Sequence, residues 1–570
     1  MINTANNTKK TIFSVLYSIT VLFCIGLKLN FIDKQILVIA EKIFSKTLRK
    51  PEKWIEIVHH TSSLVIFITS IVYFLIFTKS GAQLYSKIKE SLYAFYNKLS
   101  SEKLYQHFAF ILVFLFLVFF KVIAANYFYA DDVFRNYTGN RSWIGFSRYI
   151  SEFFSIFLHT NINLNDIAPL SQIITIFIMA ATLIMARGIF ESEKNSILKL
   201  LSLSFIFISP YFAENFSYRF DCPYMALSVF FSIFPFIFKD NLFLFSFVST
   251  VSLIFTSISY QAALGVFIVF SIFIFFENFI QNKSIKSCIK FLSACCFSFI
   301  LAMLIFKLFF MNTISNNSDD YFSSKTGFFY IFTNSFTYLK TTFSLFGNKL
   351  MKVLWISSII CFLFVSVKQS KRNKFITIFI SIITILVSYL LSYGPYLIFE
   401  RPVMLARAFM GFNAFIALVL MSIANYIEIK KSYCMQAILI FLIYSAIVFQ
   451  YTYGNCIINQ KEYENYRIQL ILNDLSSITT NKENDYKIDI KGNIDFSKKN
   501  RIALKNYPLL KSMIPQTLRE TSSWNDEIFN GYNFKCKQES LSLTEQFNCV
   551  IKNYYYVIYK CDNKIIIFLS

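Results

Sequence analysis

Two adjacent carboxylates, Asp131 and Asp132, lie in the stretch NYFYADDVFRNYTG, directly after the apolar run at 108–125. Adjacent carboxylates repel each other, and at a partly desolvated interface this repulsion raises the pKa of at least one of them. A carboxyl group with a raised pKa suits a general base that takes a proton from a hydroxyl group. The same pair is also typical of acids that only cap an outer loop, so the motif alone does not distinguish the two roles.

Arginines recur in the polar loops around other apolar runs. The planar guanidinium of arginine matches phosphate oxygens because it donates two parallel hydrogen bonds. Arg407 is predicted to lie in the first turn of an apolar helix, where a charge is costly unless it is paired or functional. The alternative for the loop ENFSYRFD is an ion pair that holds a turn. Together the loops predict a site for an anionic lipid headgroup beside a general base, formed by Arg135, Arg141, Arg148, Glu214, Arg219, Asp221, Glu400, Arg401 and Arg407.

The sequence contains no motif typical of a histidine or cysteine metal site, a phosphate-binding loop or a serine hydrolase. The four histidines, including the His59–His60 pair, do not have the spacing of metal ligands, and the 11 cysteines include no CxxC motif. A Gly-rich phosphate loop and a GxSxG motif are also absent. We therefore predict no cofactor, although two adjacent acids leave a divalent metal ion open.

Membrane helices are the elements that must position these residues. The chain has 570 residues, of which 55% are hydrophobic, and its mean hydropathy is +0.51. Its apolar runs are long enough to cross a hydrocarbon core of about 30 Å, and lipid favours helices because their backbone groups are satisfied internally. The sequence predicts an all-α polytopic membrane protein with about thirteen transmembrane helices, near 11–31, 61–78, 108–125, 171–187, 197–212, 223–238, 241–258, 262–279, 289–311, 352–367, 375–393, 406–427 and 434–452.

The charge of the loops predicts the orientation of the chain. The net charge of +22 is concentrated in short loops such as 79–107 and 368–374, which favours an orientation signal over nucleic-acid binding. With the N-terminus inside, the acidic pair and the arginine-bearing loops lie outside. The basic loop 32–60 is the exception to this orientation.

Hydropathy falls sharply after about residue 452. We therefore predict a transmembrane domain over 1–452 and a small α/β domain over 453–570 on the outer face. In an oxidising compartment its cysteines would supply a disulfide, drawn from Cys456, Cys536, Cys549 and Cys561.

The segment 143–158 is amphipathic with helical spacing. Its apolar residues include Phe146, Ile150 and Phe154, whereas Arg148 and Glu152 lie on the other side. The segment is too short and too polar on one face to span a membrane. It predicts a helix that lies in the outer interface.

Five patches of sequence resemble the bacterial glucosyl transferase II family in the same order along the chain, over about 120–450. This family contains the serotype-converting O-antigen glucosyltransferases. The first hundred residues and the tail resemble the family weakly or not at all. The patches are YADDVFRNYTGNRSWIGFSRYISEFF, NDIAPLSQI, ENFSYRFDCPYMALS, SYQAALG and ARAFMGFNAF.

The resemblance implies a GT-C-like, multi-pass enzyme of the bacterial inner membrane with a cytoplasmic N-terminus and a periplasmic C-terminal domain. Such an enzyme transfers glucose from undecaprenyl-phosphate glucose to O-antigen repeat units on the periplasmic face, and a companion flippase and a donor-synthesising transferase are implied. A donor that arrives through the membrane fits a chain without a nucleotide-binding domain.

The resemblance also assigns residues by position. Asp131 and Asp132 match the catalytic acids of the family. Arg148 follows Ser147 where the family has glycine, and Arg407 follows Ala406 where we expect proline or another small residue. The substrate-binding residues implied are Arg135, Arg148, Glu214, Tyr218, Arg219, Asp221, Gln261, Arg401 and Arg407.

Two other functions stay open at the level of sequence. An O-antigen polymerase is also a membrane glycosyltransferase, but it usually carries its large outer loop between spans, whereas this chain carries its polar bulk at the C-terminus. A flippase or transporter of lipid-linked oligosaccharides needs ionisable residues near the middle of the bilayer. Lys307 is the main candidate for such a residue.

Overall fold

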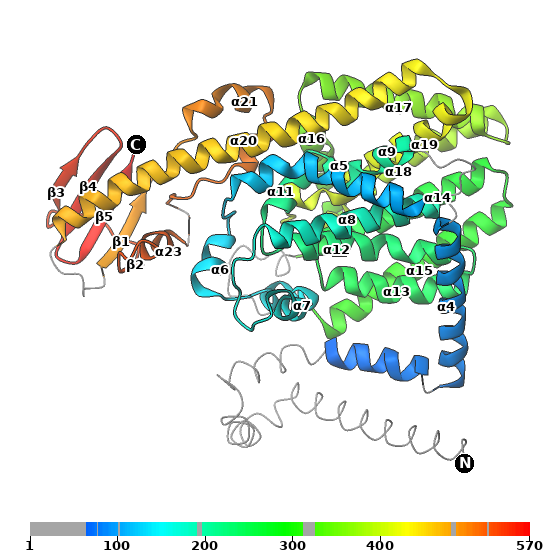
Figure 1. Cartoon of the computed structure of the whole chain (residues 1–570), viewed down its shortest axis with the longest axis horizontal. Helices are drawn as coiled ribbons and strands as arrows, with labels where there is room; N and C mark the ends of the chain where they lie inside the picture. The colour runs from blue at the N-terminus through cyan, green and yellow to red at the C-terminus, as the bar shows by residue number, and fades with distance from the viewer. Residues whose placement is uncertain are drawn as a thin grey trace, which may run out of the picture.

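The computed structural model describes residues 64–76, 78–100, 103–190, 197–311, 325–479 and 486–570, apart from Thr521 and Ser523. The predicted first span at 11–31 and the His59–His60 pair lie outside these residues. Figure 1 shows a bundle of helices that run roughly along the longest axis, a small sheet at one end, and helix α4 (Lys79–Ser100) standing across the opposite end.

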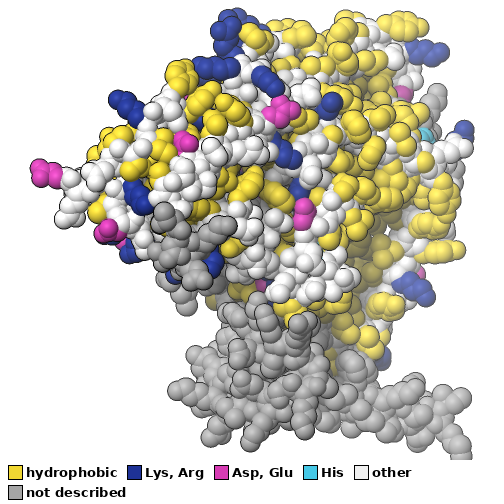
Figure 2. Space-filling view, turned by 60° about the vertical axis from the view of Figure 1, so that its left-hand side comes forward, with side chains coloured by type: hydrophobic (Ala, Val, Ile, Leu, Met, Phe, Trp, Pro, Cys, Tyr) yellow, Lys and Arg dark blue, Asp and Glu magenta, His cyan; other side chains and the backbone are white. Residues whose placement is uncertain are grey.

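Eight helices in the described part of the chain are long and apolar enough to cross a membrane, or nine if the bent pair Leu64–Ile76 and α4 forms one span. The protein is therefore a mostly helical membrane protein. Figure 2 shows a broad hydrophobic surface over the helical body. The eight are α5 (Leu104–Ala125), α8 (Leu170–Ile189), η3 with α14 (Gln261–Ile280), α15 (Ile285–Phe309), α17 (Lys349–Gln369), α18 (Lys374–Leu391), α19 (Met410–Lys430) and α20 (Tyr433–Ile478).

The predicted number of thirteen spans is not confirmed, because three of the predicted spans are shorter helices of 10–17 residues. A break at Ser204 divides the first of them, and Pro235 changes the second into a 3-10 helix. The structure also contains α16 (Phe329–Leu345), which the sequence did not predict because polar residues such as Asn334 and Lys340 interrupt its apolar run. The three short segments are α9 with α10 (Ile197–Leu203 and Phe205–Ile208), α12 with η2 (Cys222–Ile233 and Phe234–Phe238), and α13 (Leu242–Ser257).

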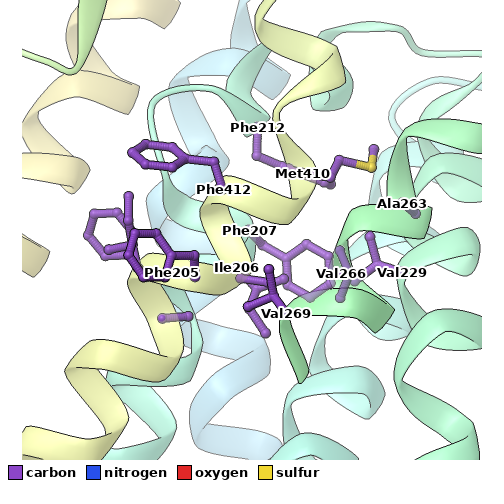
Figure 3. Close-up of a cluster of buried hydrophobic side chains, with 14 of the residues drawn as sticks. Phe205, Ile206, Phe207, Phe212, Val229, Ala263, Val266, Val269, Met410 and Phe412 are labelled. Carbon is purple, nitrogen blue, oxygen red and sulfur yellow. The ribbon is translucent and has the colours of Figure 1, made fainter. Parts of the chain in front are cut away.

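The broken segment from α9 to α11 (Phe212–Ser217) lies inside the bundle. Irregular backbone is tolerated within a membrane protein where other helices cover it, because lipid offers no hydrogen bonds. Phe205 and Phe207 of α10 are fully buried, and they pack among apolar side chains of α14 and α19 (Figure 3). The bundle therefore encloses the short helices that lead to Glu214 and Arg219.

Glycine allows a close crossing near the loop that carries Arg407. A Cβ atom at Gly265 of α14 would lie 1.9 Å from the Ser392 carbonyl oxygen, and one at Gly411 of α19 would lie 2.0 Å from the same oxygen. The two helices and the turn at Ser392 therefore meet backbone to backbone, as small residues allow in membrane bundles. This contact fixes the start of α19, three residues after Arg407.

The described strands form one five-stranded sheet in the order β2-β1-β5-β4-β3. Strand β1 is parallel to its neighbours β2 and β5, and the other pairs are antiparallel. Ile488, Ile565 and Ile567 pack against Ile471 and Leu475 of α20, so the C-terminal half of this helix closes the core of the sheet. The strands are β1 (Tyr486–Lys491), β2 (Cys536–Gln538), β3 (Asn548–Lys552), β4 (Tyr556–Cys561) and β5 (Lys564–Leu569).

The C-terminal region also contains short helices, and α20 connects it to the bundle. The predicted domain boundary at 452 falls inside α20, which runs without a break from Tyr433 to Ile478. The boundary therefore stays a prediction about domains and does not mark the end of a helix. The short helices are η7 (Lys498–Asn500), α21 (Arg501–Asn506), α22 (Leu510–Met513) and α23 (Asn525–Asn530).

The expected disulfide is not formed. Cys456, Cys536, Cys549 and Cys561 are all free thiols. The strand register explains this result, because Cys549 lies opposite Tyr559 and Cys561 lies opposite Lys564.

Candidate active site

The acidic pair begins helix α6 (Asp132–Thr138), which follows α5 after an irregular turn. Asn126 and Ala130 in this turn have positive φ angles of 44° and 47°. Asp131 occupies the N-cap position, but its side chain accepts no capping hydrogen bond. Helix capping through the side chain, the simplest role for an acid at this place, therefore does not account for Asp131.

Asp132 is fully buried beneath α6. Its Oδ2 atom accepts hydrogen bonds from the backbone N–H groups of Tyr129 at 3.1 Å and Arg219 at 3.0 Å. Burial, with help from the nearby charge of Asp221, raises the pKa of Asp132 to about 8. The carboxyl group thus ties α6 to the turn before α12, and its raised pKa comes from burial and Asp221, not from the neighbouring Asp131 as the sequence suggested.

Arg135 and Asp221 form a buried ion pair on the same side of α6. The indole N–H of Trp143 donates to the second carboxylate oxygen of Asp221, and the Arg135 guanidinium lies 4.6 Å from the centre of the Trp143 ring. Glu152 completes this layer, since it accepts from the Trp143 backbone N–H at 3.2 Å. These charges satisfy one another inside the protein, so they hold the loop in place.

Arg219 is also engaged, and its side chain is only 3% exposed. It forms an ion pair with Asp166 at 2.6 Å and donates a second hydrogen bond to the Asn126 side chain. The guanidinium lies 4.4 Å from the centre of the Phe128 ring. Arg219 therefore fastens the turn before α6 to the segment ahead of α8.

Arg407 lies in η6 (Ala406–Ala408), just before α19. Its guanidinium donates to Glu214 at 2.8 Å and to the Tyr218 hydroxyl at 2.7 Å, and its backbone N–H donates to Glu214 at 2.9 Å. Glu214 is 2% exposed, whereas the Arg407 side chain is 30% exposed. Arg407 is thus a fixed cation that retains access to its surroundings.

Tyr218 links the acidic pair to Arg407. Its ring packs against the Tyr129 ring at a centroid distance of 4.7 Å. Burial holds the pKa of Tyr218 well above its usual range, and the charges of Arg407, Glu214 and Asp131 also act on it. Its hydroxyl is therefore neutral, it accepts a hydrogen bond from Arg407, and Asp131 is close enough for its charge to act on it.

Arg148 approaches from α7 (Tyr149–His159), and its guanidinium lies 4.5 Å from the centre of the Tyr260 ring. Gln261 donates to the Phe146 carbonyl at 3.0 Å and supports this turn. Arg401 is exposed, and among the described residues no ion pair or hydrogen bond joins it to the other candidates. The structure therefore gathers most of the predicted site residues and leaves Arg401 apart.

Helix α7 starts later than predicted, and its buried side is polar whereas its exposed side is aromatic. Residues 144–146 form the separate 3-10 helix η1, and Ser147 has a positive φ of 58°, so the regular helix begins at Tyr149. Glu152 and Ser155 are buried, whereas Phe154 and Phe157 are 44% and 64% exposed. The polar face points into the protein and the aromatic face points away, which is the arrangement expected beside lipid.

The C-terminal region reaches the loop that carries the acidic pair. The Tyr129 hydroxyl donates to the Met513 carbonyl at 2.7 Å, and the Tyr127 hydroxyl donates to Glu464 of α20 at 2.9 Å. The Phe134 ring of α6 stacks on Trp524 at a centroid distance of 4.5 Å. The site is therefore held by the helical body on one side and by the C-terminal region on the other.

Sequence reasoning missed several residues of this arrangement. Asp166 and Trp143 lie within the quoted patches, but a lone acid or tryptophan carries no spacing signal. The C-terminal residues gave no signal because their partners are more than 300 positions away in the chain. In the described parts of the chain, no three His, Cys, Asp or Glu side chains gather as a metal site requires.

Comparison with known proteins agrees with the geometry. The model of the glucosyl transferase GtrII family matches residues 120–418, about half of the chain. A protein of Salmonella phage P22, described as an uncharacterized 55.3 kDa protein in the gtrB 5′ region, is 27% identical over 175 residues. That alignment covers 30% of this chain and 35% of the phage protein, so the chain spans about a third of that relative. No solved structure matches the chain significantly.

Proposed function

Because the chain belongs to the GtrII glucosyl transferase family, we propose that it transfers glucose from a polyprenyl-phosphate donor, undecaprenyl-phosphate glucose, to a hydroxyl group of O-antigen. The observation that carries this proposal is the hydrogen bond from Arg407 to the Tyr218 hydroxyl, with the charge of Asp131 near enough to act on the same tyrosine. A carboxylate and a partly exposed guanidinium beside it are what a transfer from a lipid phosphate requires.

Asp131 is the general base in this proposal, and Asp132 positions it. A base must come within hydrogen-bond distance of the acceptor hydroxyl. Asp131 is half-buried and free of a capping role, whereas Asp132 has no exposed surface and holds two backbone N–H groups. Asp131 is therefore the member of the pair that a substrate can reach.

The transfer has a simple balance of atoms. The acceptor oxygen attacks the anomeric carbon of glucose while its proton passes to Asp131. The bond between that carbon and the phosphate oxygen breaks, and its electrons leave with the polyprenyl phosphate. Arg407 stabilises the departing phosphate, with the Tyr218 hydroxyl as a second donor and Arg148 nearby.

The buried charges position these groups. Arg135, Asp221 and Arg219 are 3–4% exposed and paired. We therefore assign them to holding α6 and the Tyr218 turn, and we assign Glu214 to holding Arg407. A buried pair is costly to break because its partner is left as an uncompensated charge, so these residues also matter for folding.

The membrane arrangement follows the same proposal. The helical body adopts a GT-C-like arrangement in the bacterial inner membrane, with the N-terminus in the cytoplasm and the domain from about residue 453 in the periplasm. Basic loops such as 368–374 are in keeping with the inner side. The lipid donor enters beside α7, whose Phe154 and Phe157 face outward. A flippase and a donor-synthesising enzyme supply the substrate.

The direct test uses the purified full chain with synthetic undecaprenyl-phosphate glucose and an O-antigen oligosaccharide. We expect one added hexose per repeat unit, measured by mass spectrometry, and NMR of the product gives the linkage. A change in O-antigen chain length without added hexose would instead indicate a polymerase. Release of glucose to water alone, with no transfer at any acceptor concentration, would overturn the assignment of the acceptor.

The transporter alternative finds no support in Lys307. This residue lies in the last turn of α15, and its side chain is exposed. A lysine at a helix end extends its ammonium group to the interface. It is therefore not the buried mid-membrane charge that a transporter requires.

A further inference from the structure

Helix α6 has two faces of opposite character. Asp132 and Arg135 point inward, are 0% and 3% exposed, and form the buried contacts described above. Phe134 and Tyr137, three residues apart, lie on the other side of the helix, and Asp131 lies at the edge between the two sides, three residues before Phe134. The exposure along this second face increases from the half-buried Asp131 and Phe134 to Tyr137, which is 51% exposed. An aromatic stripe thus leads from the proposed base to the surface.

The C-terminal region widens this stripe. Trp524, directly before α23, stacks on Phe134 with an angle of 27° between the rings, and it is half-buried. From Asp131 to Tyr137 the helix advances about 9 Å, at 1.5 Å per residue. This length accommodates more than the one sugar ring that reacts.

Phe134, Tyr137 and Trp524 form an aromatic wall beside α6, and the family match covers only part of it. The match ends at residue 418, whereas Trp524 and the neighbouring contacts from Met513 and Glu464 come from outside it. The proposed base and phosphate-binding residues all lie inside the match. Trp524 is therefore the member of this wall that lies outside the matched range.

We propose that Phe134, Tyr137 and Trp524 form an acceptor subsite that binds the sugar rings next to the reacting one. The inference rests on the proposed function, because it takes the acceptor to be a polysaccharide. One face of a sugar ring carries C–H groups, and aromatic rings offer flat apolar surface with little loss of side-chain entropy. The wall is uncharged, so it suits a neutral sugar chain and not the lipid phosphate.

If the subsite binds the acceptor, its loss should change the KM for the acceptor and leave the KM for the donor unchanged. In Trp524→Ala the KM for an O-antigen oligosaccharide should increase about three- to tenfold, which corresponds to the typical strength of an aromatic contact. The KM for undecaprenyl-phosphate glucose should stay unchanged. The matched control is Tyr554→Ala. This variant removes an aromatic ring that is 87% exposed and lies in the turn between β3 and β4.

Two further variants keep the proposal testable if Trp524→Ala fails to fold. Trp524→Phe retains a flat ring and should keep the acceptor KM within about twofold of wild type, and Tyr137→Ala, at an exposed position, should increase the acceptor KM. An unchanged acceptor KM in both Trp524→Ala and Tyr137→Ala would overturn the proposal. Equal increases in donor and acceptor KM would also overturn it, since they indicate a structural effect or a lipid-binding role.

A binding measurement separates this inference from the proposed function. Tryptophan fluorescence of the full chain is titrated with the oligosaccharide in the absence of donor, and the wild-type response should be lost in Trp524→Phe. If the wild type binds in this way but transfers no glucose, the proposed function fails and the subsite stands. If it transfers glucose and the response does not depend on Trp524, the subsite fails and the function stands.

Discussion

The helical body and the C-terminal region hold the same loop by different means. The body holds the inner side of α6 through buried polar groups, namely the ion pair Arg135–Asp221 and the carboxyl group of Asp132, which accepts from the Arg219 backbone N–H. The C-terminal region holds the outer side through hydrogen bonds and ring stacking, without an ion pair to the loop among the described residues: Tyr129 donates to the Met513 carbonyl, Lys461 donates to the Asn126 carbonyl, and Phe134 stacks on Trp524. Buried charges tolerate little displacement because an unpaired charge is costly. We infer that the body sets the chemistry and that the C-terminal region sets what reaches it.

The largest effect is expected within the acidic pair. Asp131→Asn should lower kcat by about 100- to 10,000-fold, the usual contribution of a general base. Asp132→Asn should lower it far less, since an amide oxygen still accepts from the two backbone N–H groups. Rates are measured by transfer of labelled glucose, and Asp562→Asn, in the β4–β5 turn, is the control. Equal losses in the two pair variants would contradict the division of roles between Asp131 and Asp132.

The next effect concerns the proposed phosphate-binding residue. Arg407→Ala should lower kcat by about 100- to 1,000-fold, as for the loss of a charged donor at a developing negative charge. Arg407→Lys should recover only part of this loss, because an ammonium group cannot donate to Glu214 and a phosphate with the same fork geometry. Arg519→Ala, an exposed arginine of the C-terminal region, is the control. Full activity in Arg407→Ala would show that Arg407 does not stabilise the departing phosphate, and that this part of the chemistry is not set by the helical body.

The rigidity of the body is tested at Gly411. A methyl group there must displace the Ser392 backbone, and overpacking of this kind typically costs about 1–3 kcal/mol. Gly411→Ala should therefore lower Tm in detergent by several degrees. A Cβ atom at Gly145 meets nothing within 4 Å, so Gly145→Ala should leave Tm unchanged. Equal Tm values for the two variants would show that the crossing of α14 and α19 adapts.

The smallest effect is expected where the two regions meet. Tyr129→Phe removes the hydrogen bond to the Met513 carbonyl and keeps the ring against Tyr218. A neutral hydrogen bond contributes about 1 kcal/mol, so activity should fall only a few-fold. The measurement is the kcat and KM of the variant, compared with those of the wild type. A loss as large as that of Asp131→Asn would mean that the C-terminal region takes part in setting the chemistry after all.

The sequence predicted the parts of this protein that depend on local pattern. Apolar runs showed the membrane helices, and motif order showed the family and the residues that converge on Tyr218. The short helices α10 and α12 were overextended into full spans because an apolar run does not reveal that neighbouring helices cover it. Similarly, the spacing of apolar residues predicts α7 as an interfacial helix but does not reveal that Glu152 and Ser155 are buried, with Glu152 accepting from the Trp143 backbone N–H.

The contacts of the C-terminal region were beyond prediction for a related reason. Tyr129 and Met513 are 384 positions apart, and Phe134 and Trp524 have no spacing in common. Nothing in either segment specifies the other, because stacking and a carbonyl acceptor are available from almost any residue. Only the three-dimensional path of α20 brings them together.

Helix α20 sets the rotation of the C-terminal region relative to the bundle. It packs against α5 so closely that a Cβ atom at Gly454 would lie 2.7 Å from the Lys121 backbone, and it then continues to Ile478 without a break. A helix turns about 100° and rises 1.5 Å with each residue. One inserted residue after Gly454 would therefore swing the whole sheet around the helix axis and carry Trp524 away from Phe134. The number of residues in this rod, as much as their identity, is what keeps the two halves of the site facing each other.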